Sequence, residues 1–126
     1  MQKYIIPHTA TIKDALVALN EITSDAQSLL VIDDSQRLVG TLTDGDIRRG
    51  LISGAGLEDA VENIMHRDFK YILESEFDVA HLKTFRDKHF LFIPILDAEF
   101  HIVEVVNLKK YKSHLPVDAV LSFGLS

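Results

Sequence analysis

The stretch VIDDSQRLVG, residues 31–40, returns in altered form as ILDAEFHIVE, residues 95–104. Each copy has an apolar segment, a polar turn and a second apolar segment, which is typical of a β-hairpin. The copies lie 64 positions apart, and the same shift carries TIKD, residues 11–14, onto SEFD, residues 75–78. Both tetrapeptides have the Ser/Thr-x-x-Asp form that favours a helix start. One ungapped shift that aligns two separate features predicts an internal repeat.

Each copy is expected to form one β-α-β-β-α unit. In the first unit we expect strands at residues 3–6, 28–33 and 37–43, a helix from about Thr11, and a second helix over residues 44–53. The apolar residues of the first helix recur at spacings of three and four, which gives that helix one apolar face. These residues are Ile12, Ala15, Leu16, Leu19 and Ile22. The strand at residues 28–33 is almost wholly apolar, which predicts burial on both faces.

The second unit is expected to follow the same order of elements. Its strands are predicted at residues 69–72, 90–96 and 101–107, and its helix at residues 78–88. Pro94 lies inside the middle strand, where a proline removes a hydrogen-bond donor and suggests an edge position or a bulge.

The predicted fold class is therefore α/β (α+β), with two repeated units. We expect residues 1–60 to form the first unit, residues 61–114 the second and residues 115–126 a tail, with a short amphipathic connecting helix over residues 56–68. A three-stranded sheet covered on one face is only marginally stable alone. The two units are therefore expected to pack through their sheets about a pseudo-twofold axis, and the cleft between them is the natural ligand site.

Composition limits the classes of function. The 126 residues are 47% apolar, which is enough for a packed core, and carry a net charge of −6, which argues against a nucleic-acid partner. There is no cysteine, and the six histidines share no helix-face spacing, so no metal site is predicted. No signal peptide and no apolar stretch of roughly 20 residues is present. A cytoplasmic protein without a membrane partner is expected.

Three segments resemble a tandem pair of CBS domains, also called a Bateman module. They are IPHTATIKDAL (residues 6–16), GTLTDGDIRR (residues 40–49) and FLFIPILDAEFHIVEVV (residues 90–106). The resemblance is greatest to the pairs attached to sugar-phosphate nucleotidyltransferases and arabinose-5-phosphate isomerases. The tail at residues 115–126 resembles the linker into a following catalytic domain of such a nucleotidyltransferase, although it lacks that domain's run of glycines.

The resemblance implies a regulatory module and not an enzyme. Such a module would bind an adenosine-type nucleotide between its units, with AMP, ADP, ATP or S-adenosylmethionine as possible ligands and no catalytic cofactor. It would modulate an attached or partner nucleotidyltransferase, and it would pair with a second copy through its helices to form a homodimer. The alternative is a structural homodimerisation module with no bound nucleotide.

The family's ligand motif, Gly-x-x-Ser/Thr-x-x-Asp, is matched by Gly40, Thr43 and Asp46. In the family, the hydroxyl binds ribose or phosphate oxygens and the carboxylate accepts from both ribose hydroxyls. A phosphate is also favoured at the start of a helix. Arg49 is a candidate phosphate ligand, and His8 is expected near the mouth of the cleft. These five residues make up the predicted nucleotide-binding site.

The motif also has a purely structural interpretation, and it occurs only once. Thr43 and Asp46 have the spacing of a capping box, so a helix cap alone would explain them. The 64-residue shift places Glu104, Asn107 and Lys110 at the equivalent positions of the second unit, where the glycine, hydroxyl and carboxylate are all missing. We therefore expect at most one ribose-binding site per chain.

Overall fold

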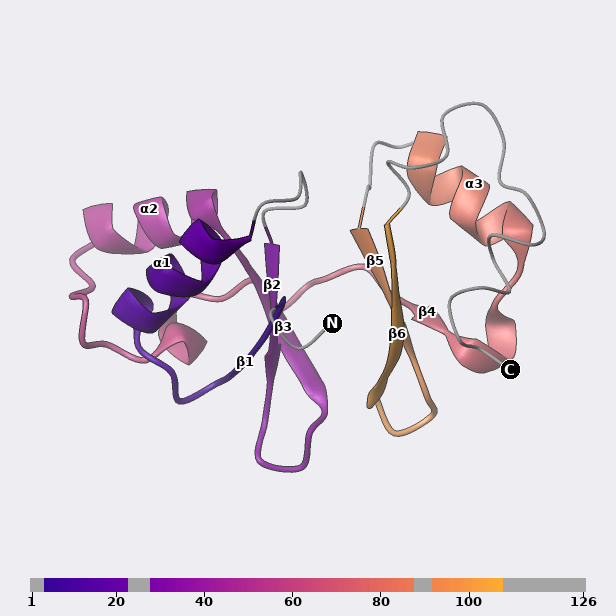
Figure 1. The fold of residues 1–126 in the computed structure, drawn as a ribbon, viewed down its shortest axis with the longest axis horizontal. Helices are drawn as coiled ribbons and strands as arrows, with labels where there is room; N and C mark the ends of the chain where they lie inside the picture. The colour runs from indigo at the N-terminus through magenta and orange to yellow at the C-terminus, as the bar shows by residue number, and fades with distance from the viewer. Residues whose placement is uncertain (1–3, 23–27, 88–91, 108–126) are drawn as a thin grey trace. The chain divides into compact units, whose positions relative to one another are not determined.

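The computed structural model describes residues 4–22, 28–87 and 92–107. The chain divides into two compact units, residues 1–69 and 70–126, each with one three-stranded sheet (Figure 1). This confirms the expected α/β class, and the packing of the two units against each other stays a prediction. Within the described ranges, no helix is long and apolar enough to cross a membrane.

The first unit contains β1 (Ile5–Pro7), α1 (Ile12–Glu21), β2 (Ser28–Ile32), β3 (Leu38–Thr43) and α2 (Asp44–Ile52). Its strand order is β1-β2-β3, with β1 parallel and β3 antiparallel to the central β2. Both helices cover the same face of this sheet (Figure 1). The order of elements is the one that the sequence predicts.

The apolar face of α1 packs on this sheet. One core cluster contains side chains from both elements, among them Ile12, Ala15, Leu19, Ile22, Leu29, Val31 and Leu42. Leu30 points to the other face of β2, because successive side chains of a strand alternate, and it is buried as well. The continuous apolar run of β2 therefore does correspond to burial on both faces.

The second unit contains β4 (Ile72–Leu73), α3 (Val79–Asp87), β5 (Phe92–Leu96) and β6 (Ile102–Asn107), with strand order β4-β5-β6. A short 3-10 helix, η3 (Glu74–Glu76), separates β4 from α3. As in the first unit, the outer strands are parallel and antiparallel to the central one.

The two hairpins share one register, which confirms the repeat. Val31 pairs with Gly40 in the first hairpin, and Ile95 pairs with Glu104 in the second, each 64 positions later. In both hairpins the register shifts at the next residue. The copies therefore agree in their irregularities as well as in their pairing.

Pro94 lies on the central strand of the second sheet, so the expectation of an edge position is wrong. The short β4 pairs only with Ile95 and Leu96, and Pro94 faces Val105 on the other side. No strand residue of β4 therefore needs a donor from Pro94. The register irregularity between Ile95 and Leu96 agrees with the alternative expectation of a bulge near this proline.

The start of the second unit's helix also differs from the repeat pattern. The helix predicted over residues 78–88 is observed as α3, but Ser75 lies within η3, so the Ser75-x-x-Asp78 pattern does not mark the start of α3 as its counterpart marks the start of α1. The carbonyl of Asp78 accepts the N–H of Leu82 at 3.5 Å, and the Leu82 side chain is fully buried. The helix therefore places Leu82 in the core of the second unit.

The segment over residues 57–66, here called the return segment, folds back over the first unit. The carbonyl of Asp59 accepts the N–H of Ile12 at 2.9 Å, at the start of α1. Further along, Thr41 and His66 exchange two backbone hydrogen bonds of 2.9 and 2.8 Å. The return segment is thus tied both to α1 and to β3.

The return segment is not the amphipathic helix expected over residues 56–68. Its helical part is a single 3-10 turn, η2 (Val61–Asn63). Because its bonds lie within the first unit, the boundary between the units falls after Phe69 rather than after residue 60. The tail at residues 115–126 lies outside the described residues.

Candidate functional site

The polar stretch predicted as the ligand site forms the junction of β3 and α2. Thr43 is the N-cap of α2, with φ −110° and ψ 168°. Its hydroxyl oxygen accepts the N–H of Asp46 at 3.2 Å, while Oδ2 of Asp46 accepts the N–H and the hydroxyl of Thr43, both at 2.9 Å. This is a complete capping box, so the cap that the spacing of Thr43 and Asp46 predicts is confirmed.

The second carboxylate oxygen of Asp46 binds Arg49. Nη2 of Arg49 lies 2.6 Å from Oδ1 of Asp46. The Asp46 side chain is only 12% exposed, whereas that of Arg49 is 72% exposed. The guanidinium rests over Gly45, where a Cβ atom would lie 3.3 Å from Nη1. Both oxygens of Asp46 therefore have partners within the chain.

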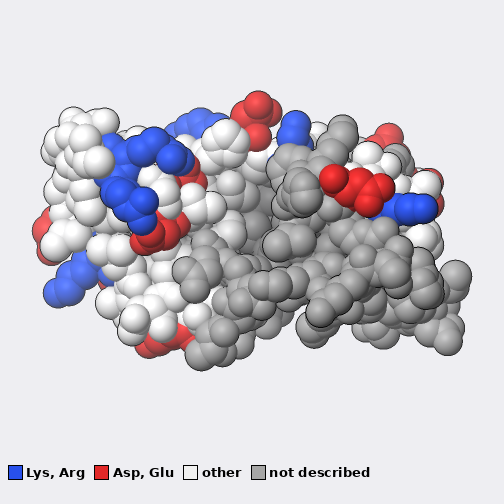
Figure 2. Space-filling view, turned by 90° about the horizontal axis from the view of Figure 1, so that it is seen from above, with Lys and Arg blue, Asp and Glu red and all other residues white. Residues whose placement is uncertain are grey.

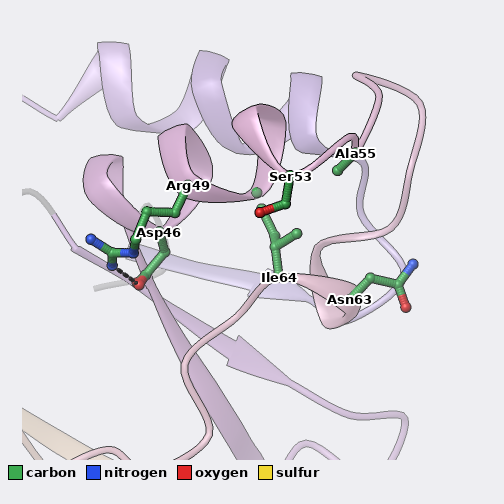
Figure 3. Close-up of a pocket in the computed structure, with 7 residues that line it drawn as sticks. Asp46, Arg49, Ser53, Ala55, Asn63 and Ile64 are labelled. Carbon is green, nitrogen blue, oxygen red and sulfur yellow. Dashed lines mark hydrogen bonds and ion pairs between the residues drawn. The ribbon is translucent and has the colours of Figure 1, made fainter.

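A pocket of about 380 Å³ opens between α2 and the return segment (Figure 3). Its lining residues come from these two segments and the turn between them: Asp46, Arg49, Gly50, Ser53, Ala55, Asn63 and Ile64. Asp46 and Arg49 lie at one end, and Asn63 lies at the other. The volume falls within the range of about 300–1,000 Å³ that is usual for small-molecule sites. A carboxylate, a guanidinium, a hydroxyl and an amide offer polar partners.

Gly40 does not line this pocket. A Cβ atom at Gly40 would lie 2.5 Å from Sδ of Met65 and 3.2 Å from the carbonyl oxygen of His66. The close approach that the sequence predicts at this glycine is therefore made by the return segment. Its place in the motif is explained by packing between β3 and that segment.

His8 lies at the other end of the sheet from Thr43. The His8 N–H donates to the carbonyl of Ile32 at the end of β2, whereas Thr43 pairs with Ser28 at the beginning of β2. The structure thus brings Thr43, Asp46 and Arg49 together and leaves His8 apart from them.

The His8 ring instead joins two carboxylates. Its Nδ1 lies 2.6 Å from Oε2 of Glu62 on η2, and its Nε2 lies 3.3 Å from Oδ1 of Asp34 in the hairpin turn. The hydrogen bond with Glu62, followed by that with Asp34, raises the pKa of His8 above its usual 6.5. This favours an imidazolium that holds the turn to the return segment.

The second unit lacks the counterpart of this site. Glu104 stands where the first unit has Gly40, and its Oε1 accepts the N–H of Val105 at 3.0 Å. Asn107, at the position equivalent to Thr43, is the last residue of β6. Lys110, at the position of Asp46, lies outside the described residues.

A group that could bind a cation lies in the second hairpin turn. Ligand atoms of Asp97, Glu99 and His101 all lie within 4.8 Å of one another. Oδ1 of Asp97 accepts the backbone N–H groups of Glu99 and His101 at 2.9 and 2.8 Å. Asp33 organises the first hairpin turn in the same way, with Arg37 in place of the histidine. The repeated turn accounts for the arrangement.

Charged side chains of both signs lie side by side on the face drawn in Figure 2. On α2, Arg48 pairs with Asp44 and Arg49 pairs with Asp46. The described residues of this face therefore do not form a continuous basic surface.

Sequence reasoning missed the far wall of the pocket. Ser53, at the end of α2, and Asn63, on η2, had no recognisable pattern. Asn63 reaches the pocket only because the return segment folds back. The signal that could have predicted this is the buried Val61 and Met65, if they had been assigned to the first unit's core.

Residues 1–53, which contain the whole Gly40–Asp46 motif, match the CBS domain family. An uncharacterized protein of Helicobacter pylori strain J99 is 37% identical over 59 residues, which are 47% of this chain and 17% of that protein. Arabinose 5-phosphate isomerase GutQ of Escherichia coli O6:H1 is 38% identical over 61 residues, which are 48% of this chain and 19% of that protein. The match thus spans less than a fifth of either relative.

Solved structures match over most of the chain. A CBS domain protein from Streptococcus pneumoniae has a TM-score of 0.71 at 18% identity, and the match covers 94% of this chain and 78% of that one. CBSX2 in complex with AMP has a TM-score of 0.68 at 21% identity, covering 94% and 87%. The cytosolic domain of the Mg²⁺ channel MgtE in complex with ATP has 0.64 at 22% identity, covering 97% and 45%. Residues 1–53 therefore match the CBS domain family, and the chain has the fold of a CBS domain pair.

Proposed function

We propose that the chain is a regulatory module that binds an adenosine-type nucleotide through Thr43, Asp46 and Arg49. One observation carries this proposal: the three side chains meet at the junction of β3 and α2, and two of them line a pocket of ligand size. The structures of CBSX2 with AMP and of the MgtE domain with ATP support an adenine nucleotide as the ligand class.

The chemistry of these residues suits the parts of a nucleotide. A carboxylate accepts hydrogen bonds, and a ribose offers two adjacent hydroxyl donors to it. A guanidinium binds phosphate oxygens through two parallel N–H groups, and the start of α2 adds a partial positive charge. Asp46 would therefore contact the ribose, and Arg49 would contact the phosphate.

The regulated protein would be an enzyme of sugar-phosphate metabolism, attached or bound as a partner. The sequence resemblance favours a nucleotidyltransferase, while the match to GutQ equally supports an isomerase of a sugar phosphate. A ligand alters such an enzyme only if it binds two arrangements of the module unequally.

The test is calorimetry with AMP, ADP, ATP and S-adenosylmethionine on the chain and two variants. Asp46→Asn removes a charged acceptor, so affinity should fall roughly ten- to a hundredfold, while the melting temperature changes little because the amide oxygen can still cap the helix. Asp44→Asn is the matched control on the same helical turn and should leave affinity unchanged. Equal affinities in both variants, with a lower melting temperature for Asp46→Asn, would show that the motif is only a cap.

A second candidate function is a structural homodimerisation module. Apolar side chains are exposed on the helices of the first unit: Val17 is 52% exposed on α1, and Ile52 is 79% exposed at the end of α2. Exposed apolar residues of this kind favour association with another surface. Light scattering and calorimetry together separate this function from ligand binding. A dimer whose mass does not change with nucleotide, and that shows no nucleotide affinity, would support the homodimerisation module.

A further inference from the structure

Arg49 occupies the acceptor that a ribose would need. Oδ2 of Asp46 accepts two hydrogen bonds from Thr43, and Oδ1 accepts one from Arg49 at 2.6 Å. The cap keeps Oδ2 in place, since the Asp46 side chain is nearly buried. A pair of ribose hydroxyls can therefore reach the carboxylate only at Oδ1, after the guanidinium has moved.

We propose that Arg49 selects ligands that carry a phosphate, by blocking Asp46 until a phosphate draws the guanidinium away. This inference rests on the proposed nucleotide-binding function and adds a rule of specificity to it. Adenosine must break the Arg49–Asp46 ion pair and offers no anion in exchange. A nucleotide breaks the same ion pair and gives Arg49 a new anionic partner.

The geometry allows this exchange. The Arg49 side chain is 72% exposed, and exposed ion pairs are weak because water screens them. The guanidinium rests over Gly45, which has no side chain to hold it. Asp46 offers Arg49 a single hydrogen bond at Oδ1, whereas a phosphate can bind the guanidinium through two parallel charged hydrogen bonds, so phosphate is the stronger partner.

The consequence is an order among ligands of the same base and sugar. AMP, ADP and ATP carry the group that moves Arg49, whereas adenosine does not. Affinity is therefore set by the phosphate even though the ribose is bound by Asp46.

Arg48 provides a matched control on the same helix. Its side chain is 69% exposed and pairs with Asp44, but neither residue lines the pocket. Arg48→Ala and Arg49→Ala thus remove the same charge and a comparable helical ion pair. They differ in whether Asp46 is freed.

The experiment is calorimetry of AMP and adenosine with the whole chain, Arg49→Ala and Arg48→Ala. In Arg49→Ala, adenosine should bind about two- to fivefold more tightly, because the surface ion pair no longer competes for Asp46. AMP should bind about tenfold more weakly, because the phosphate has lost its guanidinium. The preference for AMP over adenosine should therefore fall by more than tenfold, and Arg48→Ala should keep it.

Three results would overturn the inference, and they differ in what else they overturn. If AMP binds the chain but Arg49→Ala weakens AMP and adenosine equally, Arg49 does not compete for Asp46, and the proposed function survives. If neither AMP nor adenosine binds the chain or any variant, the nucleotide-binding function fails and the inference fails with it. A lower melting temperature alone in Arg49→Ala, with the preference for AMP unchanged, would mean that the ion pair only stabilises α2.

Discussion

Asp46 performs two tasks with different oxygen atoms. Oδ2 completes the cap of α2, and Oδ1 faces Arg49 at the end of the pocket. The two interpretations of the motif are therefore compatible, because the cap leaves one oxygen whose partner is an exposed and replaceable side chain.

The two capping boxes of the first unit allow the tasks of Thr43 to be separated. Thr11 caps α1 through the same pair of bonds with Asp14, both at 3.1 Å, and neither residue lines the pocket. Thr43→Ala and Thr11→Ala should each lower the free energy of unfolding by about 1 kcal/mol, because each removes one side-chain cap. Only Thr43→Ala should weaken AMP binding. Urea unfolding and calorimetry on both variants check this, and an equal loss of affinity would contradict a direct ligand role for Thr43.

His8 predicts a pH dependence of stability. Its hydrogen bonds to Glu62 and Asp34 raise its pKa in the folded protein above the ordinary value of 6.5. A raised pKa means that the imidazolium stabilises the fold fully below pH 6.5, and that this contribution is lost as the pH rises through the folded-state pKa. The difference in unfolding free energy between the chain and His8→Gln should therefore shrink between pH 5.5 and 8.5.

The partner of His8 supplies the control for that measurement. Glu62→Gln removes the first cause of the raised pKa, so the pH dependence attributable to His8 should become smaller in this variant. Denaturant titrations at each pH give the comparison. A difference between the chain and His8→Gln that grows with pH would contradict the assignment.

At the scale of elements, the hairpins and the span of α3 could be predicted from sequence, but the way in which α3 begins could not. Hairpin register is set locally by turn residues, and Asp33 and Asp97 organise equivalent turns with Gln36 and Phe100 in the left-handed region at φ 66° and 68°. The Ser/Thr-x-x-Asp pattern is less informative, because its first residue can belong to a 3-10 turn instead of capping an α-helix. In the second unit Ser75 belongs to η3, and α3 begins at Val79.

The return segment shows the same limit for the candidate site. The apolar residues of this segment have the spacing of an amphipathic helix. Its backbone, however, forms hydrogen bonds with α1 and β3 instead of the hydrogen bonds of a continuous helix. A pattern of apolar residues cannot distinguish these outcomes, because both bury Val61 and Met65. The motif end of the pocket was therefore predictable, while the wall with Asn63 depended on long-range pairing.

Gly50 is expected to control the spacing of α2 and the return segment. A Cβ atom there would lie 2.6 Å from Cγ2 and 3.1 Å from Cβ of Ile64. Gly50→Ala should therefore lower the free energy of unfolding by about 1–3 kcal/mol through overpacking, against a helix-propensity gain of about 1 kcal/mol. Ile64→Ala removes Cγ2, so it should cost less stability in the Gly50→Ala chain than in the unaltered chain. Thermal unfolding of the single and double variants measures both, and a more stable Gly50→Ala would contradict tight packing here.

At the scale of the whole molecule, the repeat carries its polar site in one copy only. The hairpin backbones agree residue for residue, yet the first unit has Gly40 where the second has Glu104. A module of this kind should bind one nucleotide per chain at this type of site. The stoichiometry from the AMP titration reports this directly.

Self-association is expected through the helices of the first unit. The chain should have the mass of a homodimer by light scattering at micromolar concentration, because Val17 and Ile52 expose apolar surface on α1 and α2. Ile52→Glu should shift the mass towards one chain, since burying a lone charge is costly. Leu57→Glu changes an exposed leucine of the return segment and serves as the control. The mass of one chain for the unaltered protein would count against a dimer.

The return segment also connects the pocket to the second unit. It forms one wall of the pocket at Asn63 and Ile64, and a few residues later the backbone enters the second unit at Lys70. We expect a ligand bound against that wall to alter the backbone segment that continues directly into the second unit. A flexible insertion after Asp68 would lengthen this connection without changing the pocket wall. It would therefore separate the affinity for the ligand from the effect of ligand binding on the second unit.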